Sequence, residues 1–193
     1  MSNTIRIVPY DRRWPDEFRQ IGQALRTVLG DLALRIDHIG STSVPGLAAK
    51  DIIDIQVTVH TLDAAALSTA LARPGYTRID GITRDHVPPG GLPAAEEWQK
   101  LYFRPPPGQR PTHLHVRQQG RANQRYPLLF RDCLRANPAT AEAYRQIKEA
   151  LARLDPEDVD AYYAVKDPVC DIIIDVARAW AGATGYQPGP SDA

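Results

Sequence analysis

Residues 38–56 read HIGSTSVPGLAAKDIIDIQ, and this stretch decides how the chain is built. A strand-like run ends at Gly40–Ser41, a loop of small residues follows with Lys50 near its end, and a second strand-like run carries Asp54 on its polar face. Backbone N–H groups of a glycine–serine turn can bind phosphate oxygens, and a carboxylate on the next strand can bind a metal ion beside them. The order of these parts predicts a site for a phosphorylated ligand at one edge of a sheet.

The length and composition of the chain fit one ordinary globular domain. Its 193 residues are 43% hydrophobic and 24% charged, which is close to the average for globular proteins. No apolar run approaches the roughly 20 residues of a membrane-spanning helix, and the N-terminus lacks the apolar core of a signal peptide. We therefore expect a cytoplasmic protein without a membrane segment, whose two cysteines are free thiols.

The basic residues are unevenly distributed, although the formal net charge is zero. Seven arginines and one acid lie between Arg104 and Arg135, a segment that can contact a polyanion. The simpler explanation is a genomic preference for arginine, because the chain has 19 arginines and only 4 lysines. RNA is thus an alternative partner, but the neutral total charge argues against nucleic-acid binding as the main function.

Hydrophobic periodicity predicts a mixed sheet followed by a group of helices, which is an α+β fold. Strands are expected at about 32–40, 52–59, 76–82, 99–104 and 112–117. Helices are expected from Trp14 to Gly30, after Asp63 and from Asn123 onward, with breaks at Asp155-Pro156 and Asp167-Pro168. We expect a single domain over residues 1–182, with the sheet in about 1–118 and the helices in about 119–182, and a disordered tail at 183–193.

Six residues are candidates to bind phosphate, and two structural arguments select them. A glycine-led turn offers a permissive backbone and hydroxyl groups, and a lysine or arginine close by can neutralise a phosphate. The candidates are Gly40, Ser41, Thr42, Ser43, Lys50 and Arg117. Lys166 is a further cation that can contact an anion. For each of them the alternative is structural, a polar turn or a solvated cation.

Asp54 interrupts an apolar strand, where a lone carboxylate is costly unless it is paired, hydrogen-bonded or metal-bound. His113 and His115 alternate with apolar residues on a later strand and therefore share one face. With Asp54 they can form a site of two histidines and one carboxylate, a donor set that suits Zn²⁺, Mn²⁺ or Fe²⁺ better than Mg²⁺. Two alternatives stay open: a hydrogen-bonded histidine pair lining a polar cleft, or Asp54 and His115 as catalytic groups.

The chain resembles the GrpB family, also called UPF0157, over about residues 5–180. The resemblance rests on these stretches: Val8-Pro9-Tyr10-Asp11, His38 to Lys50, Ile53-Asp54-Ile55, His113 to Val116 and Leu128 to Asp132. It implies a nucleotidyltransferase-like mixed sheet flanked by helices, with a helical group at the C-terminal end. In that superfamily a Gly-Ser turn precedes a strand with two acids, and a third acid lies on a later strand. Together these acids bind two divalent metals.

Gly40-Ser41 and Asp54 match this pattern, whereas Gln56 stands where the second acid is expected and the later strand carries His113 and His115. The resemblance implies a nucleotide or phosphorylated small molecule as ligand, one divalent ion (Mg²⁺, Mn²⁺ or Zn²⁺), and nucleotidyl or phosphoryl transfer as the reaction to test. A similar domain occurs fused to dephospho-CoA kinase, which indicates nucleotide or coenzyme metabolism. The alternative is a catalytically incomplete relative that assists the folding or interaction of a protein partner.

Overall fold

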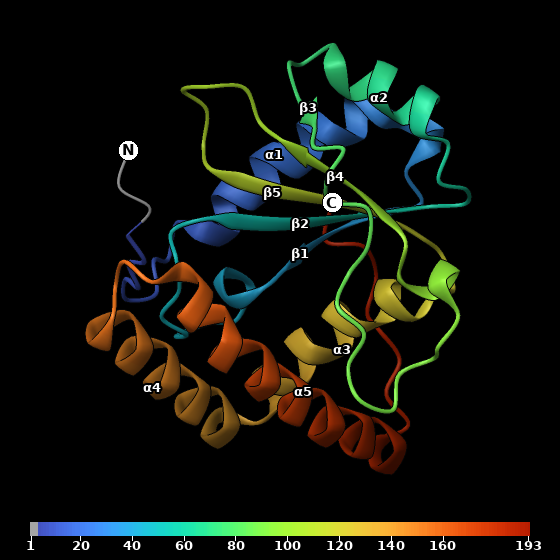
Figure 1. The fold of residues 1–193 in the computed structure, drawn as a ribbon. Coiled ribbons are helices and arrows are strands. Elements are labelled where there is room, and N and C mark those ends of the chain that lie inside the picture. Colours follow the sequence, from blue (N-terminus) through green and yellow to red (C-terminus); the bar gives the residue numbers. More distant parts are fainter. Residues whose placement is uncertain (1–3) are drawn as a thin grey trace.

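The computed structural model describes residues 4–193 and shows a five-stranded mixed sheet between two layers of helices (Figure 1). The strand order is β1 (Arg35–Ile39), β2 (Ile53–Val59), β5 (Thr112–Gln118), β4 (Lys100–Arg104) and β3 (Thr77–Arg78). Only β2 and β5 are parallel; the other neighbouring strands are antiparallel. The α+β prediction is confirmed, and the first three residues of the expected domain lie outside the described residues.

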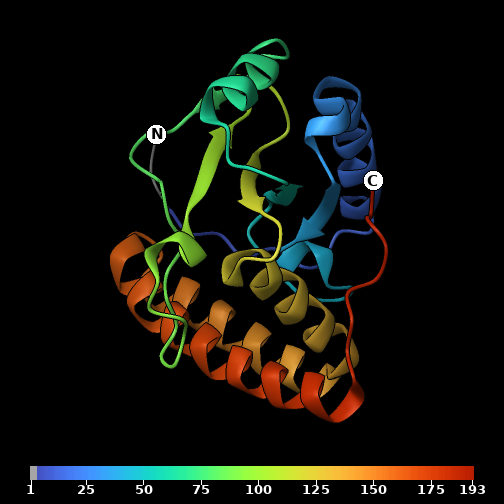
Figure 2. The ribbon, with the colours of Figure 1, turned by 90° about the vertical axis from the view of Figure 1, so that its right-hand side faces the viewer.

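The helices divide between the two faces of the sheet (Figure 2). One face packs against α1 (Trp14–Leu29) and α2 (Ala64–Ala72). The other face is covered by α3 (Ala122–Ala136), with α4 (Pro138–Leu154) and α5 (Val159–Thr184) packed beyond it. The expected C-terminal helical group is therefore present. No helix among the described residues is long and apolar enough to cross a lipid bilayer.

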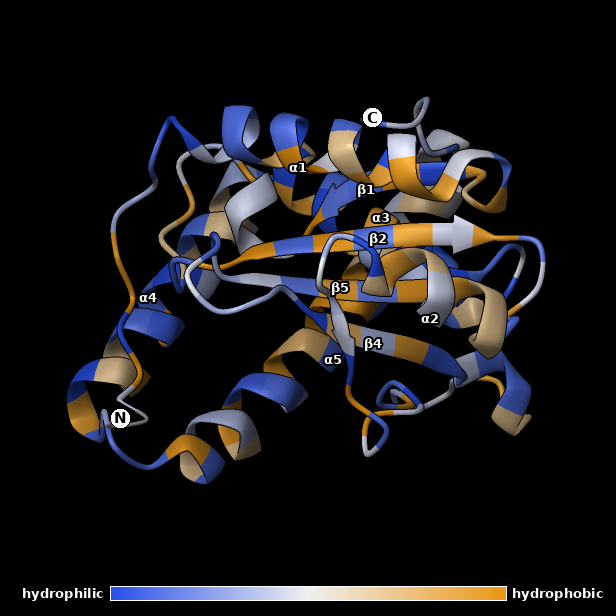
Figure 3. Ribbon diagram, turned by 90° about the horizontal axis from the view of Figure 1, so that it is seen from above, coloured by the Kyte–Doolittle hydropathy of each residue, from blue (hydrophilic) through white to orange (hydrophobic). Residues whose placement is uncertain are grey.

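The alternation of β2 decides which face holds the core and which holds the site. Ile53, Ile55 and Val57 are fully buried on the face toward α1, and Figure 3 shows apolar residues along β2 and β5. Burying each such side chain contributes roughly 1.5–3 kcal/mol. Because side chains alternate along a strand, Asp54 and Gln56 point to the opposite face, toward α3. The hydrophobic pattern thus forces a carboxylate and an amide into the space between the sheet and the helical group.

Helix α5 corrects one expected boundary. The sequence predicts a break at Asp167-Pro168, but a single helix continues through Pro168 from Val159 to Thr184. Proline removes one hydrogen bond of the helix and disfavours its interior. Here packing of α5 against both α3 and α4 outweighs that local cost. The strand expected at 76–82 is also shorter, since only Thr77–Arg78 pairs with β4.

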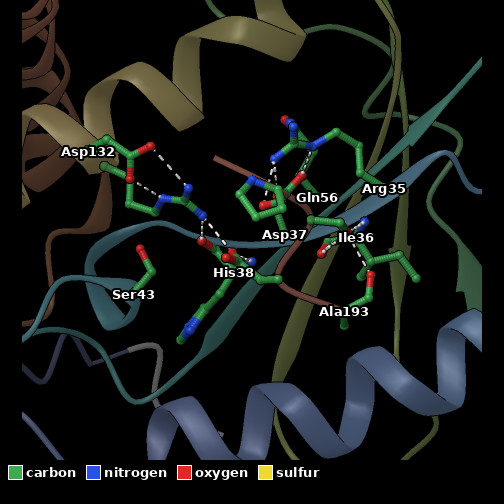
Figure 4. Close-up of polar contacts among 12 residues, drawn as sticks. Arg35, Ile36, Asp37, His38, Ser43, Gln56, Asp132 and Ala193 are labelled. Atoms are coloured by element: carbon green, nitrogen blue, oxygen red, sulfur yellow. Dashed lines mark hydrogen bonds and ion pairs between the residues drawn. The ribbon is translucent and has the colours of Figure 1, made fainter. Parts of the chain in front are cut away.

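The C-terminal segment, expected to be disordered, instead runs along the exposed edge of β1. Ser191 Oγ accepts a hydrogen bond from the Ile36 N–H (2.8 Å), and the Ala193 N–H donates to the Ile36 carbonyl (3.1 Å). Asp192 Oδ2 accepts from the His38 N–H (3.0 Å) and from Arg131 (2.6 Å). Figure 4 shows Ala193 beside Ile36. An edge strand presents unpaired N–H and C=O groups, and this segment satisfies them.

Replacing Asp192 with Ala should lower the free energy of unfolding by about 1–2 kcal/mol, because hydrogen bonds to a charged group are lost at the β1 edge. Arg131 keeps Asp132 as a partner, which limits the loss. Urea unfolding measures the change. The matched control is Asp175→Ala, which removes an exposed carboxylate paired with Arg178 and should change stability by less than about 0.5 kcal/mol. Equal effects of the two substitutions would contradict the role of the segment.

Candidate functional site

A cavity of about 300 Å³ lies between the polar face of the sheet and the helical group. We call it the large cavity, because it is larger than the neighbouring hollow of about 210 Å³ that shares part of its wall. The sheet contributes Gly40, Ser41, Asp54 and His115, and the loop between β3 and β4 contributes Asp85, His86 and Trp98. The helices contribute Tyr126, Phe130, Tyr144, Lys166 and Cys170. The cavity therefore has ionisable groups at the sheet and aromatic rings at the helices.

Gly40 and Asp54 meet at the entry to the cavity, where β1 and β2 pair Ile39 with Asp54. A Cβ added to Gly40 would lie 2.4 Å from Asp54 Oδ2, which is far inside van der Waals contact. The backbone at Gly40 also has φ +70°, a conformation that glycine adopts without strain. The Gly-Ser turn is therefore required on steric grounds to leave room for the carboxylate.

The parallel register of β2 and β5 brings the two histidines to Asp54. His113 lies opposite Asp54, and its Nδ1 is 3.0 Å from Asp54 Oδ1. One ligand atom from each of Asp54, His113 and His115 falls within 4.8 Å of the others. The sequence thus correctly placed these three side chains together, although they come from positions about 60 residues apart.

The surroundings of His115 determine where its ring proton lies. Its Nδ1 is 3.3 Å from Lys100 Nζ and 3.3 Å from Arg117 Nη2. These two cations can only donate, so Nδ1 accepts and the proton resides on Nε2. Burial, and then the charges of Arg117 and Lys100, hold the pKa of His115 well below its usual range. His115 is consequently a neutral hydrogen-bond donor through Nε2.

This tautomer bears on the metal site expected from the sequence. A histidine binds a metal through a nitrogen lone pair, and the lone pair of His115 faces two cations. Asp54 and His113 can supply a carboxylate oxygen and an imidazole nitrogen, whereas His115 does not fit as the third ligand. The donor set therefore fits a divalent ion held by two side chains, with its other ligands from the substrate or water.

Arg117 borders the large cavity and is engaged in a buried ion pair. Its guanidinium makes two hydrogen bonds to Asp85, at 2.8 and 2.9 Å, and a third to Gln56 Oε1 at 2.8 Å. Lys100 Nζ lies 2.6 Å from Asp85 Oδ1. Burial would raise the pKa of Asp85, but the charge and hydrogen bonds of Arg117 and the charge of Lys100 hold it well below its usual range. The phosphate role expected of Arg117 stays a prediction, which these existing partners disfavour.

Two residues of the turn also have other partners. Thr42 Oγ1 contacts His38 Nε2 at 3.0 Å and the Ile52 carbonyl, and Ser43 Oγ donates to the Gly40 carbonyl at 2.6 Å. These hydroxyl groups stabilise the turn, and the phosphate role expected of Thr42 and Ser43 stays a prediction. Gly40 and Ser41 do line the large cavity. Lys50 lies nearby, where its Nζ is 2.8 Å from Tyr163 Oη.

The arginine-rich segment carries little unpaired charge. Five of its seven arginines form ion pairs: Arg110, Arg117, Arg121, Arg131 and Arg135. A polyanion needs cations whose charge is free to meet phosphates. The pairing therefore disfavours an RNA site on this segment.

Sequence reasoning missed Asp85 and Lys148. Asp85 comes from a loop rich in proline and glycine, which has no periodicity to place it. Lys148 lies on α4 in an ordinary amphipathic pattern, yet its Nζ donates to Ser41 Oγ at 2.9 Å. No motif surrounds either residue, and a charged residue is usually expected at the surface.

The geometry of this site accompanies a clear sequence relationship, since the family model described as GrpB protein matches residues 4–175. The chain belongs to the GrpB family. A UPF0157 protein of Halalkalibacterium halodurans is 34% identical over 178 residues, which cover 91% of this chain and 84% of that protein. A solved structure, the conserved protein GrpB from Enterococcus faecalis, has a TM-score of 0.70 at 32% identity and covers 91% of this chain and 99% of that chain.

Other relatives are longer than this GrpB chain. A protein of Mycolicibacterium paratuberculosis named dephospho-CoA kinase is 39% identical over 198 residues, which cover 95% of this chain and 48% of that protein. The chain thus spans about half the length of the curated relatives that carry this name. The kinase name describes those whole proteins.

Gly40→Ala should destabilise the protein by about 1–3 kcal/mol more than Gly46→Ala, because only the first Cβ collides with Asp54. Gly46 is a matched control: it lies in the same loop, also has positive φ, and has no atom within 4 Å of an added Cβ. Urea unfolding of both variants gives the difference. If the two variants lost equal stability, the close approach of Gly40 and Asp54 would not limit which residue can occupy position 40.

Asp85→Asn should lower the free energy of unfolding by about 3–5 kcal/mol, because it leaves Lys100 and Arg117 buried without their carboxylate. The pKa of Asp85 is depressed in the folded protein, so its stabilisation is complete above about pH 4, the unfolded value, and is lost as the pH falls toward the folded value. Chemical unfolding at several pH values should therefore show a smaller acid-induced loss of stability in the variant. Parallel pH curves for the two proteins would contradict this assignment.

Proposed function

We propose that the chain binds a nucleotide, or a similar phosphorylated small molecule, in the large cavity. The observation that carries the proposal is the division of this cavity into an aromatic end on the helices and a polar end on the sheet. A nucleotide has the same two chemical parts, a flat base and a phosphate group. Pockets for such ligands are usually largely apolar, with a few placed polar groups.

The aromatic end offers ring faces for a base. Tyr126 and Phe130 stand on successive turns of α3 with ring planes only 10° apart and centroids 6.0 Å apart. Tyr144 meets Phe130 edge to face at 5.8 Å, and Trp98 closes the wall from the loop. A base stacked on such rings gains about 1–3 kcal/mol.

The polar end has groups suited to a phosphate and to a reacting centre. Gly40 and Ser41 present the turn, and Lys166 reaches the same cavity from α5. We propose that one divalent ion binds through Asp54 and His113 together with phosphate oxygens of the ligand. The ion would supply charge neutralisation there. His115, through its Nε2–H, donates a hydrogen bond to the reacting group.

Nucleotidyl or phosphoryl transfer is the reaction that we propose for this arrangement. Gln56 takes the place of a second acid and is fully buried among other partners, so a pair of metals bound by several carboxylates is not part of the proposal. The dephospho-CoA kinase name of the longer relatives is in keeping with a nucleotide-related role.

A second candidate function is protein interaction without catalysis. Its support is a row of exposed apolar residues on α5, where Val165, Ile172 and Val176 recur at helical spacing and Ile172 is 67% exposed. A partner protein could cover this row. Failure of the nucleotide experiment below would favour this alternative.

Isothermal titration with ATP, GTP, CTP and UTP, each with Mg²⁺ or Mn²⁺, tests the proposed function. We expect at least one nucleotide to bind, and Asp54→Asn to weaken metal-dependent binding at least about tenfold, which corresponds to ~1.4 kcal/mol. Phe130→Ala should weaken binding with and without metal, because it removes a ring from the aromatic end. Asp175→Asn, an exposed carboxylate, is the control. Absence of nucleotide binding, or unchanged binding by folded Asp54→Asn, would overturn the proposal.

A further inference from the structure

All four lysines of the chain lie around one site. Lys100 contacts His115, and Lys50, Lys148 and Lys166 line a second hollow of about 210 Å³. We call this hollow the lysine chamber. Its other walls include Ser41, Asp54, His113, Tyr162 and Tyr163.

This distribution is informative because the chain otherwise uses arginine. It has 19 arginines against 4 lysines, so a surface position that only requires a positive charge is usually occupied by arginine. Lysine differs by its compact ammonium group with three donors on a flexible stem. Retention of lysine at a single site indicates that the small ammonium group is needed there.

Lys148 is the strongest evidence within the chamber. Its side chain is buried, only 2% of the residue being exposed, and its Nζ donates to Ser41 Oγ at 2.9 Å and to the Ala48 carbonyl at 2.6 Å. Its other contact is the Tyr144 ring, whose centre lies 4.6 Å from Nζ, and among residues 4–193 no carboxylate forms an ion pair with this ammonium group. A buried cation without a counter-ion is costly. Burial, and then the charge of Lys166, lower the pKa of Lys148 to about 7.

The other two lysines add positive charge to the same space. Lys50 Nζ hydrogen-bonds to Tyr163 Oη and lies 4.6 Å from the centre of that ring and 5.0 Å from that of Tyr162. Lys166 Nζ lies 5.5 Å from the Tyr163 ring centre and is paired with Asp167 at 3.2 Å. Tyrosine faces stabilise ammonium groups without neutralising them. The three ammonium groups outnumber the two carboxylates beside them, Asp54 and Asp167, so the chamber holds a net positive charge that an anion would offset.

The lysine chamber adjoins the large cavity, and most of their lining residues differ. The two hollows share only Ser41, Asp54, His115 and Lys166. The Asp54 carboxylate stands on this shared wall, so the group that we propose to bind the divalent ion borders both hollows. If each hollow holds its own ligand, only the reacting ends of the two ligands meet at Asp54 and His115.

We propose that the lysine chamber binds the phosphate monoester of a second small molecule, at the same time as the nucleotide occupies the large cavity. The second-ligand part rests on the proposed function; the anion site itself does not. The phosphate dianion accepts hydrogen bonds from Lys50, Lys148 and Lys166, and Asp54 and His115 face both ligands. The site is thus arranged for a phosphorylated acceptor.

Titration of the whole chain with inorganic phosphate, followed by ³¹P line width, tests the anion site. We expect wild-type protein to bind phosphate and Lys148→Met to weaken that binding at least tenfold. The same variant should unfold at a higher temperature, because it replaces an unpaired buried charge with an apolar chain of similar length. Arg153→Met, which removes an exposed cation from the same helix, should leave phosphate binding unchanged. Lys50→Met provides an independent loss of affinity if Lys148→Met does not fold.

A second titration adds phosphate to protein saturated with the nucleotide that binds most tightly. Unchanged phosphate affinity supports two simultaneous ligands, whereas competition overturns the second ligand and means that one molecule fills both hollows. Phosphate binding that survives in both lysine variants, or no binding to wild-type protein, overturns the anion site. Phosphate binding without any nucleotide binding would contradict the proposed function alone and leave the anion site standing.

Discussion

The buried ion pair between Asp85 and Arg117 connects several of the elements that border the large cavity. Asp85 belongs to the loop between β3 and β4, Arg117 to β5, and the guanidinium continues to Gln56 on β2. Gln56 Nε2 then donates to the Gln124 carbonyl of α3 at 2.9 Å. The same carboxylate neutralises Lys100, so it also makes two cations tolerable beside His115. A loop, two strands and a helix are therefore positioned by one charge, and the protonation of His115 follows from it.

This network gives Gln56 a meaning that its position in the sequence does not. In the nucleotidyltransferase pattern, the position of Gln56 would carry the second metal-binding acid. In the structure it accepts from Arg117 and donates to the α3 backbone. An ionised glutamate can accept but cannot donate, so it would leave the Gln124 carbonyl without this partner. The amide is thus consistent with a site organised around the single carboxylate of Asp54.

The parts of the fold that could be predicted are those specified by local patterns. Alternation on β2 and β5 correctly placed Asp54, His113 and His115 on one face, and the Gly-Ser turn marked the close approach to Asp54. What could not be predicted depends on contacts between distant segments. Asp85 meets Arg117 across 32 positions, and Lys148 meets Ser41 across 107. The C-terminal segment is ordered by the β1 edge, and nothing in its own composition favours order.

Lys148 also shows why the stability and the function of this site have to be considered together. A protein selected for stability alone would place an apolar side chain at this position, because hydrogen bonds donated to neutral oxygens offset only part of the cost of desolvating an ammonium group. Natural proteins retain such destabilising residues where ligand binding requires them. In a chain that uses arginine almost everywhere else, an unpaired buried lysine beside the Gly-Ser turn is best understood as half of an ion pair. The ligand would supply the negatively charged half of this pair.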